Sequence, residues 1–259
     1  MKTVIYYFTG TGNSLSLAKK LSEKIGNCDL IPVAKALANK EFSCDYEKVG
    51  FVFPVYFHGN PLIVNEFIEK LEIKKESYLF AVVNMGGSPN LCDDITNEVL
   101  SKKDMKLNAF FQLRMVSNYI SYFQPIKESK MAKVFDEADK KLNEIAEIVS
   151  NKDCKIENSF FLFKLFFSIF YKFFKKKARI CDKKYKIEEQ CNGCGTCAKV
   201  CPVNNIEMKE GKPTFNNRCE QCYACINLCP KEAIQIGFSK SKKRYKHPEI
   251  SIKEIIEQK

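Results

Sequence analysis

Two short stretches decide how this chain folds: CNGCGTCAKVCP at residues 191–202 and CEQCYACINLCP at residues 219–230. Each has the spacing Cys-x2-Cys-x2-Cys-x3-Cys-Pro, and every cysteine of the second run lies 28 residues after its counterpart in the first. Three closely spaced cysteines place three thiolates on one tight loop, and the proline after the fourth ends a short helix. Thiolates in this pattern fit the iron corners of a [4Fe-4S] cluster.

The repeated pattern resembles the bacterial-type ferredoxin domain with two [4Fe-4S] clusters, and the resemblance covers about residues 187–238. In that arrangement the fourth cysteine of each run ligates the other cluster. The resemblance therefore implies two ligand sets, which are Cys191, Cys194, Cys197 and Cys229 for one cluster and Cys219, Cys222, Cys225 and Cys201 for the other. The alternative is structural zinc, but zinc needs two cysteine pairs rather than triplets followed by Cys-Pro.

A second motif lies near the start of the chain. Residues 2–8 are β-branched and aromatic, as in a buried parallel strand, and Thr9, Gly10, Thr11, Gly12, Asn13 and Ser14 follow at once. Apolar residues at helical spacing then run from Leu15 to Ile25. A strand, a small-residue loop and a helix form the layout in which backbone N–H groups and hydroxyls bind a phosphate. The loop lacks the lysine of a Walker P-loop, so it suits a terminal phosphate monoester such as that of FMN.

This loop resembles the FMN phosphate loop of flavodoxins, and the resemblance covers about residues 1–150. It implies an α/β fold with a doubly wound, flavodoxin-like parallel five-stranded sheet in the order 2-1-3-4-5, joined to a small α+β ferredoxin domain. Two later loops follow expected strands at 49–53 and 78–84, and the resemblance implies that they hold the isoalloxazine ring. Their residues are Pro54, Val55, Tyr56, Phe57 and Gly59 in one loop and Asn84, Met85, Gly86 and Gly87 in the other.

Individual roles also follow from the flavodoxin resemblance. Tyr56 is the first choice for an aromatic ring stacked on the flavin and Tyr119 the second, with plain packing as the alternative for both. The peptide of Gly59 would offer its carbonyl to the flavin N5, because glycine adopts either sign of φ. His58 could act as a proton donor there, although a solvated loop histidine is favoured.

The segments outside the two motifs are expected to join them. Residues 151–186 form a connector, in which 160–174 hold eight of the 21 phenylalanines, and residues 239–259 form a basic tail with a short helix. The aromatic run is too short and too charged to span a bilayer. We favour a helix packed between the domains, with its basic side free for an acidic redox partner, over one lying on a membrane surface.

Composition limits the remaining possibilities. A chain of 259 residues suits one medium and one small domain. The five cysteines outside the cluster pattern show no pairing rhythm, and no cleavable signal is expected, so the sequence indicates a reducing cytosol. Two clusters and a phosphate monoester would lower the formal charge of +11 by about 6, which weakens a nucleic-acid interpretation.

Over its whole length the chain resembles flavodoxin–ferredoxin fusion proteins of anaerobes. The resemblance implies an electron carrier that passes electrons between FMN and two [4Fe-4S] clusters, and so between two-electron and one-electron carriers. The alternative is a flavin-dependent oxidoreductase whose clusters feed electrons to a substrate or metal centre bound over the FMN. The sequence shows no catalytic dyad or triad beside the flavin loops, so we expect a carrier.

Overall fold

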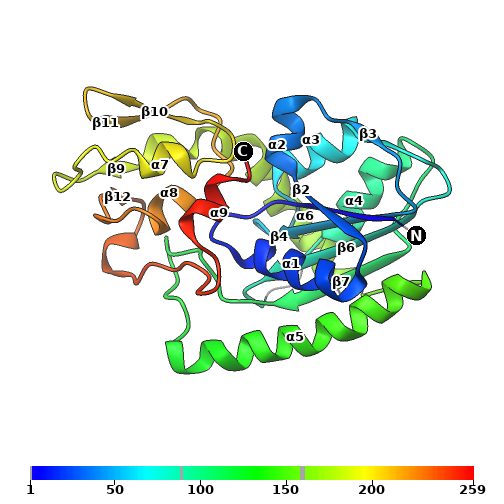
Figure 1. Ribbon diagram of the computed structural model, residues 1–259. Coiled ribbons are helices and arrows are strands. Elements are labelled where there is room, and N and C mark those ends of the chain that lie inside the picture. The colour runs from blue at the N-terminus through cyan, green and yellow to red at the C-terminus, as the bar shows by residue number, and fades with distance from the viewer. Residues whose placement is uncertain (1, 88–89, 158–160) are drawn as a thin grey trace.

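The computed structural model describes residues 2–87, 90–157 and 161–259 (Figure 1). Residue 160, where the aromatic run was expected to begin, and residues 88–89 of the third loop lie outside this part of the chain. The described chain forms a larger α/β half and a smaller cysteine-rich half, with the C-terminus lying between them (Figure 1).

The larger half is built on one parallel sheet. Its strand order is β2 (Cys28–Pro32), β1 (Thr3–Tyr7), β4 (Lys48–Pro54), β6 (Tyr78–Met85), β7 (Ala109–Arg114) and β8 (Lys155–Ile156). The first five strands confirm the expected order 2-1-3-4-5. The sixth strand, β8, has two residues and was not expected. It forms because the chain that leaves the helix ending at Asn151 pairs with Ala109 and Phe110 of β7.

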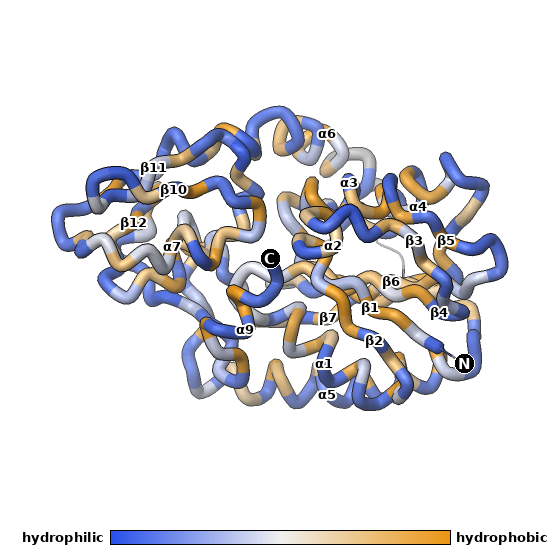
Figure 2. Tube along the Cα trace, turned by 45° about the horizontal axis from the view of Figure 1, so that its top comes forward, coloured by the Kyte–Doolittle hydropathy of each residue, from blue (hydrophilic) through white to orange (hydrophobic). Residues whose placement is uncertain are grey.

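Helices cover both faces of this sheet, so its central strands are buried along almost their whole length, and Figure 2 shows them as mostly hydrophobic. One face carries α1 (Asn13–Ile25) and α5 (Glu128–Asn151), and the other carries α2 (Val33–Asn39), α3 (Leu62–Lys70) and α4 (Cys92–Ser101). The short strands β3 (Ser43–Cys44) and β5 (Glu72–Ile73) pair beside the main sheet. In α5, the expected apolar face is buried at Val134, Ala138, Leu142, Ile145, Ala146 and Val149.

A connector joins the halves through α6 (Phe161–Lys177) and the 3-10 helix η1 (Ala178–Lys184). Tyr171 and Phe174 of α6 are buried, while Ile169, Phe170 and Phe173 are exposed. Lys164 pairs with Asp93 and Asp94 of α4 (both 2.8 Å). None of the helices in the described residues combines the length and apolarity that a bilayer crossing would require.

The smaller half is built from two antiparallel strand pairs and two short helices. Strands β9 (Lys186–Ile187) and β12 (Ile234–Gln235) pair antiparallel, as do β10 (Ile206–Lys209) and β11 (Lys212–Phe215). The helices are α7 (Thr196–Lys199) and α8 (Ala224–Asn227), and the 3-10 helix η2 (Ser239–Ser241) and α9 (Ile252–Ile256) follow. Its core includes Ile120 of the larger half, so the two halves share packing.

Candidate cofactor sites at the carboxyl edge of the sheet

The loop Thr9–Ser14 leaves β1 at the carboxyl edge of the sheet and enters α1. Gly12 has a φ of 104°, a left-handed conformation that favours glycine. The N–H of Gly12 donates to Thr9 Oγ1 (3.1 Å), and Ser14 Oγ accepts from Asn84 Nδ2 (2.6 Å). All six loop residues are buried. The hydroxyls of Thr9 and Ser14 therefore already help to fix the shape of the loop.

The second loop is a tight turn that begins at Tyr56 and is closed by Gly59. Tyr56 and Gly59 exchange two backbone hydrogen bonds (2.8 and 3.0 Å), so the Gly59 carbonyl accepts from Tyr56 N–H. Positive φ values fall instead on Phe57 (47°) and His58 (69°). The Val55 N–H donates to the carbonyl of Asn84, the first residue of the third loop (2.9 Å). The peptide role inferred for Gly59 at a flavin N5 stays a prediction.

The third loop leaves the neighbouring strand at the same level. Pro54 and Asn84 are register partners at the ends of β4 and β6, and Met85 is the last residue of β6. A Cβ on Gly86 would lie 3.0 Å from Ser117 Cβ, and Gly87 has a φ of 120°. The structure thus brings all three predicted loops to one edge of the sheet, as the parallel topology requires.

The two aromatic candidates lie between the halves. Tyr56 is 7% exposed, packs edge-on against Phe8, and its hydroxyl has no hydrogen-bond partner among the described residues. Burial raises the pKa of Tyr56 well above its usual value, and the charges of Cys222 and Glu220 add to the rise. Tyr119 contacts the ring of Tyr223 at a centroid distance of 5.3 Å. Stacking of either ring on a flavin stays a prediction.

The first set of predicted cluster ligands comes together across the smaller half. Burial raises the pKa of Cys197 to about 11, and the charges of Cys229, Cys194 and Cys191 add to the rise. Cys229 thus acts on Cys197 electrostatically, although 32 residues separate the two in the sequence. The N–H of Ala233 donates to Cys229 Sγ (3.3 Å).

The second set converges beside the first. Burial raises the pKa of Cys225 well above its usual value, and the charges of Cys222, Cys219 and Cys201 add to the rise, followed by that of Cys197. Cys201 Sγ accepts a hydrogen bond from the Asn205 N–H (3.3 Å). Cysteines ligate a metal as thiolates, so cluster binding releases protons from any of these thiols that are still protonated.

These thiols fit [4Fe-4S] clusters better than single metal ions. Within residues 2–87, 90–157 and 161–259, no three Cys, His, Asp or Glu side chains are grouped closely enough to hold one ion. Structural zinc requires all four ligands on one ion, whereas a [4Fe-4S] cube takes one thiolate at each iron corner. The spacing Cys-x2-Cys-x2-Cys-x3-Cys-Pro, which occurs twice, therefore suits two such cubes.

Two residues beside the second ligand set carry no recognisable signal in the sequence. The Tyr185 hydroxyl lies 3.6 Å from Cys219 Sγ and 3.9 Å from Cys181 Sγ. A hydrogen bond from Cys181 to Cys219 is the first cause of the lowered pKa of Cys219. Hydrogen bonds to ligand sulfurs are one means by which a protein sets cluster potential. Cys181 and Tyr185 therefore belong to the surroundings of this cluster.

The cluster loop of the second set lies directly on the phosphate loop. A Cβ on Gly10 would be 2.5 Å from the carbonyl oxygen of Cys222, so only glycine fits there. The Asn118 Nδ2 donates to the same oxygen (3.0 Å). A Cβ on Gly59 would be 2.4 Å from the ring of Tyr171 in α6. The cluster loop and the connector therefore cover the carboxyl edge together.

An ion pair anchors this contact from the other side. Glu220, between two cluster ligands, pairs with Arg179 of η1 and accepts a hydrogen bond from the Ile63 N–H at the start of α3 (3.3 Å). Its side chain is fully buried, whereas that of Arg179 is 34% exposed. The positive end of the α3 dipole also favours a carboxylate at this position.

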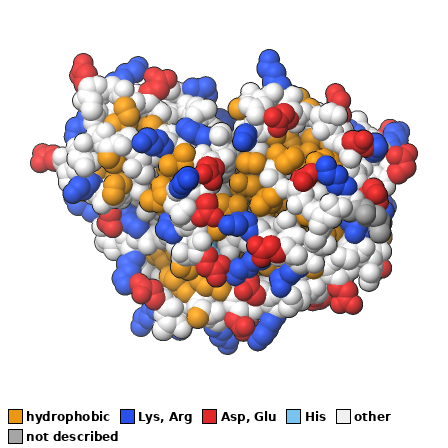
Figure 3. All heavy atoms as spheres, in the orientation of Figure 1, with side chains coloured by type: hydrophobic (Ala, Val, Ile, Leu, Met, Phe, Trp, Pro, Cys, Tyr) orange, Lys and Arg blue, Asp and Glu red, His pale blue; other side chains and the backbone are white. Residues whose placement is uncertain are grey.

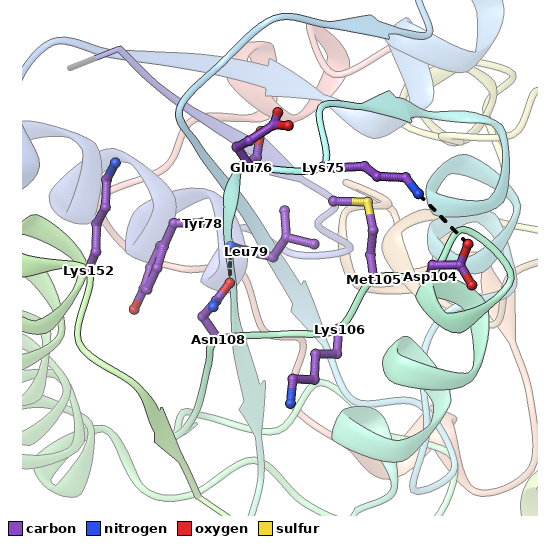
Figure 4. A pocket seen from close by; sticks show the side chains of 10 residues that line it. Lys75, Glu76, Tyr78, Leu79, Asp104, Met105, Lys106, Asn108 and Lys152 are labelled. Carbon is purple, nitrogen blue, oxygen red and sulfur yellow. Dashed lines mark hydrogen bonds and ion pairs between the residues drawn. The ribbon is translucent and has the colours of Figure 1, made fainter.

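The hollows found in the surface lie away from these loops. One, of about 420 Å³, opens at the opposite edge of the sheet and is lined by Tyr78, Leu79, Asn108 and neighbouring charged residues (Figure 4). Its side chains are spread around an open rim, where Lys75 pairs with Asp104 and Asn108 accepts from the Leu79 N–H. This hollow brings no converging set of chemical groups together.

We expect stability to fall below about pH 6.5 because His247 is buried and neutral. His247 is 1% exposed, and burial lowers its pKa from 6.5 to about 4. Between these values the unfolded chain binds a proton that the folded chain does not, so acidification favours unfolding. From pH 7.5 to 5.5 this amounts to about 1.4 kcal/mol. Urea unfolding at both pH values measures it, and His247→Leu removes the difference; an unchanged pH slope in that variant contradicts the assignment.

Comparisons with known proteins agree with the two-part architecture. Residues 4–143 match a family model described as a flavodoxin domain, and residues 190–233 match one described as a 4Fe-4S dicluster domain. A stretch of 24 residues, 9% of this chain, is 67% identical to Ferredoxin-1 of Rhodospirillum rubrum and spans 44% of that protein. The chain thus spans less than half the length of that relative.

The solved structures with a similar region include the following two. Rubredoxin oxygen:oxidoreductase from Desulfovibrio gigas is 15% identical over 58% of this chain and 36% of its own, with a TM-score of 0.38. An FMN-dependent NADH-azoreductase from Bacillus anthracis, solved with FMN, is 10% identical over 58% of this chain and 100% of its own, with a TM-score of 0.37.

Proposed function

Because the chain belongs to the flavodoxin family through residues 4–143 and carries a 4Fe-4S dicluster domain at residues 190–233, we propose that it passes electrons between FMN and two [4Fe-4S] clusters. The flavodoxin domain implies FMN and the dicluster domain implies the clusters, so the chain is a flavin and iron–sulfur redox protein. The transfer between the two kinds of cofactor is the proposed step.

The contact between Gly10 and Cys222 carries this proposal. A residue of the predicted phosphate loop touches the carbonyl of a predicted cluster ligand, with 2.5 Å between that oxygen and a Cβ built on Gly10. No intervening side chain separates the two binding loops at this point. A flavin exchanges two electrons in single steps and each cluster exchanges one, so this proximity suits conversion between two-electron and one-electron carriers.

The protein's own residues position the loops and keep water from them. Asn118 holds the Cys222 carbonyl, and its own carbonyl accepts from Asn227 Nδ2 (3.2 Å) in α8. Tyr171 donates to the Asn60 carbonyl (2.9 Å) and accepts from Asn65 Nδ2 (2.9 Å), which fixes α6 over the second loop. A rigid, dry contact of this kind keeps the distance between the binding loops constant.

The covered edge favours a carrier over the alternative, a reductase with a substrate bound above the flavin. Such an enzyme needs open space at the carboxyl edge, where the described residues instead place Tyr171 and the Cys222 loop. Electrons would then leave through a redox partner. The exposed lysines of α6 (Lys172, Lys175, Lys176 and Lys177) suit an acidic partner protein, and the free thiols suit a reducing cytosol.

The direct test is anaerobic purification followed by rapid reduction. We expect bound flavin together with about eight iron atoms per chain, and bleaching of the flavin absorbance after the clusters are reduced. The experiment follows the flavin and cluster absorbance in a stopped-flow instrument. A colourless, zinc-loaded protein, or reduced clusters that never bleach the flavin, contradicts the proposal.

The hydroxyls of Thr9 and Ser14 should contribute to the affinity for FMN and should not affect the iron content. We expect the double replacement Thr9→Ala and Ser14→Ala to weaken FMN binding by at least about tenfold, since a hydrogen bond to a charged group contributes about 1.5–3 kcal/mol. Quenching of FMN fluorescence measures the affinity, and iron quantitation serves as the control. Loss of both cofactors would mean that the two halves do not bind them independently.

A further inference from the structure

The last fifteen residues lie across the phosphate loop. Residues 245–259, here called the tail, include α9, which lies beside the end of β1 and the start of α1 (Figure 1). Gln258 is 1% exposed, and its Oε1 accepts a hydrogen bond from the Thr9 N–H (3.3 Å). Its Nε2 donates to the Ile255 carbonyl (3.0 Å), which orients the amide. A tail oxygen thus accepts from a backbone N–H at the start of the loop.

Three further contacts hold the tail on the rest of the loop. The His247 N–H donates to the Thr11 carbonyl (2.8 Å), and the Tyr245 hydroxyl donates to Asn13 Oδ1 (2.6 Å). A Cβ on Gly12 would lie 2.9 Å from His247 Cβ and 3.0 Å from Ile250 Cβ. Tail atoms therefore lie at van der Waals distance from the loop backbone.

The tail also brings acidic groups close to the loop. Glu249 accepts from Ser16 Oγ (3.3 Å) in the first turn of α1 and pairs with Lys20 (3.1 Å). Glu254 pairs with Lys19 (2.8 Å) and completes a capping box with Ser251. Figure 3 shows acidic and basic side chains side by side on the face that carries α9. These carboxylates would repel a phosphate dianion at the same helix terminus.

The forces that hold the tail are weak enough to be reversed. Its helix has five residues, too short to be stable alone, and its ion pairs are partly exposed. Its apolar contact comes from Ile250 at 2% and Ile255 at 0% exposure, together with the buried ring of Tyr245. Lys259 Nζ reaches the Ala198 carbonyl (2.9 Å) between two cluster ligands. The tail therefore contacts both halves of the molecule.

We propose that the tail and the phosphate of FMN compete for the loop Thr9–Ser14, so that FMN binds fully only when the tail has lifted. This inference rests on the proposed function, because it concerns the same FMN site. The apparent dissociation constant for FMN then equals the intrinsic constant divided by the fraction of chains with an open loop. Changes that detach the tail should tighten FMN binding without touching any FMN contact.

A matched pair of replacements in α9 tests the competition in the full chain with its clusters in place. Ile255→Asp puts a charge at a fully buried position and should detach the tail, whereas Ile252→Asp puts the same charge at a position that is 37% exposed. We expect Ile255→Asp to bind FMN at least about tenfold more tightly than the unmodified chain, and Ile252→Asp to bind it as the unmodified chain does. Fluorescence quenching of FMN measures all three.

Two further measurements locate the effect. Hydrogen exchange in residues 245–259 of the unmodified chain should increase when FMN is added. Riboflavin, which lacks the phosphate, should gain less affinity than FMN from Ile255→Asp. Equal FMN affinity in all three chains, protection of the tail by FMN, or an equal gain for riboflavin would overturn the competition. Absence of FMN binding in every chain would overturn the proposed function itself, together with the competition.

Discussion

Replacing Cys201 with alanine is expected to remove about four of about eight iron atoms and to leave the other cluster intact. Cys201 belongs by sequence to the first cysteine run, but the ferredoxin arrangement assigns it to the cluster of Cys219, Cys222 and Cys225, and its charge raises the pKa of Cys222 and Cys225. The cluster held by those three cysteines therefore loses a ligand. Iron quantitation and EPR of the reduced protein measure the loss.

Cys229→Ala is the matched control for this experiment, because it should remove the opposite cluster. The two variants should each retain one cluster, and their EPR spectra should differ from each other. If Cys201→Ala instead lost the cluster of its own run, the exchange of fourth ligands would be wrong. Burial of Cys201 makes some loss of stability expected as well, so folding should be checked by circular dichroism.

Arg179→Ala is expected to lower the free energy of unfolding by about 2–3 kcal/mol. The replacement leaves the fully buried carboxyl group of Glu220 without its cation. The effect should be smaller than for a fully buried pair, because one third of Arg179 is exposed and water screens it. Anaerobic urea unfolding followed by circular dichroism measures this change.

A second replacement separates the ion pair from other roles of the arginine. Glu220→Gln keeps the shape of the side chain and removes the charge, so the double variant should recover part of the stability lost in Arg179→Ala. It also keeps an oxygen that can accept from the Ile63 N–H. Simple additivity of the two single effects would show that the pair contributes nothing to the contact between η1, the cluster loop and α3.

The features predicted well from sequence are those encoded over short distances. The cysteine spacing, the loop Thr9–Ser14 and the hydrophobic runs of β4 and β6 are each complete within about a dozen residues. Such patterns constrain the backbone directly, since thiolates must surround a cluster and small residues must line a phosphate loop. The parallel topology then brings the three loops to one edge without further information.

The contacts that could not be predicted depend on single residues far apart in the chain. Gln258 contacts Thr9 although 249 positions separate them in the sequence. Nothing in the sequence around this glutamine predicts that partner. Glu220 and Arg179 look like ordinary surface charges until the fold buries one of them. The sequence shows that position 56 carries an aromatic ring, but not which groups the ring contacts. Those contacts depend on how the other half of the molecule packs against the loop.

The contact between Thr9 and Gln258 has a consequence for the order of folding. Closing a loop of 249 residues has a high entropic cost, so this contact forms after the local structure on either side of it. During synthesis the first strand and its glycine-rich turn emerge long before their cover. Until residues 245–259 have been translated, the nascent chain therefore exposes the loop Thr9–Ser14 without its cover.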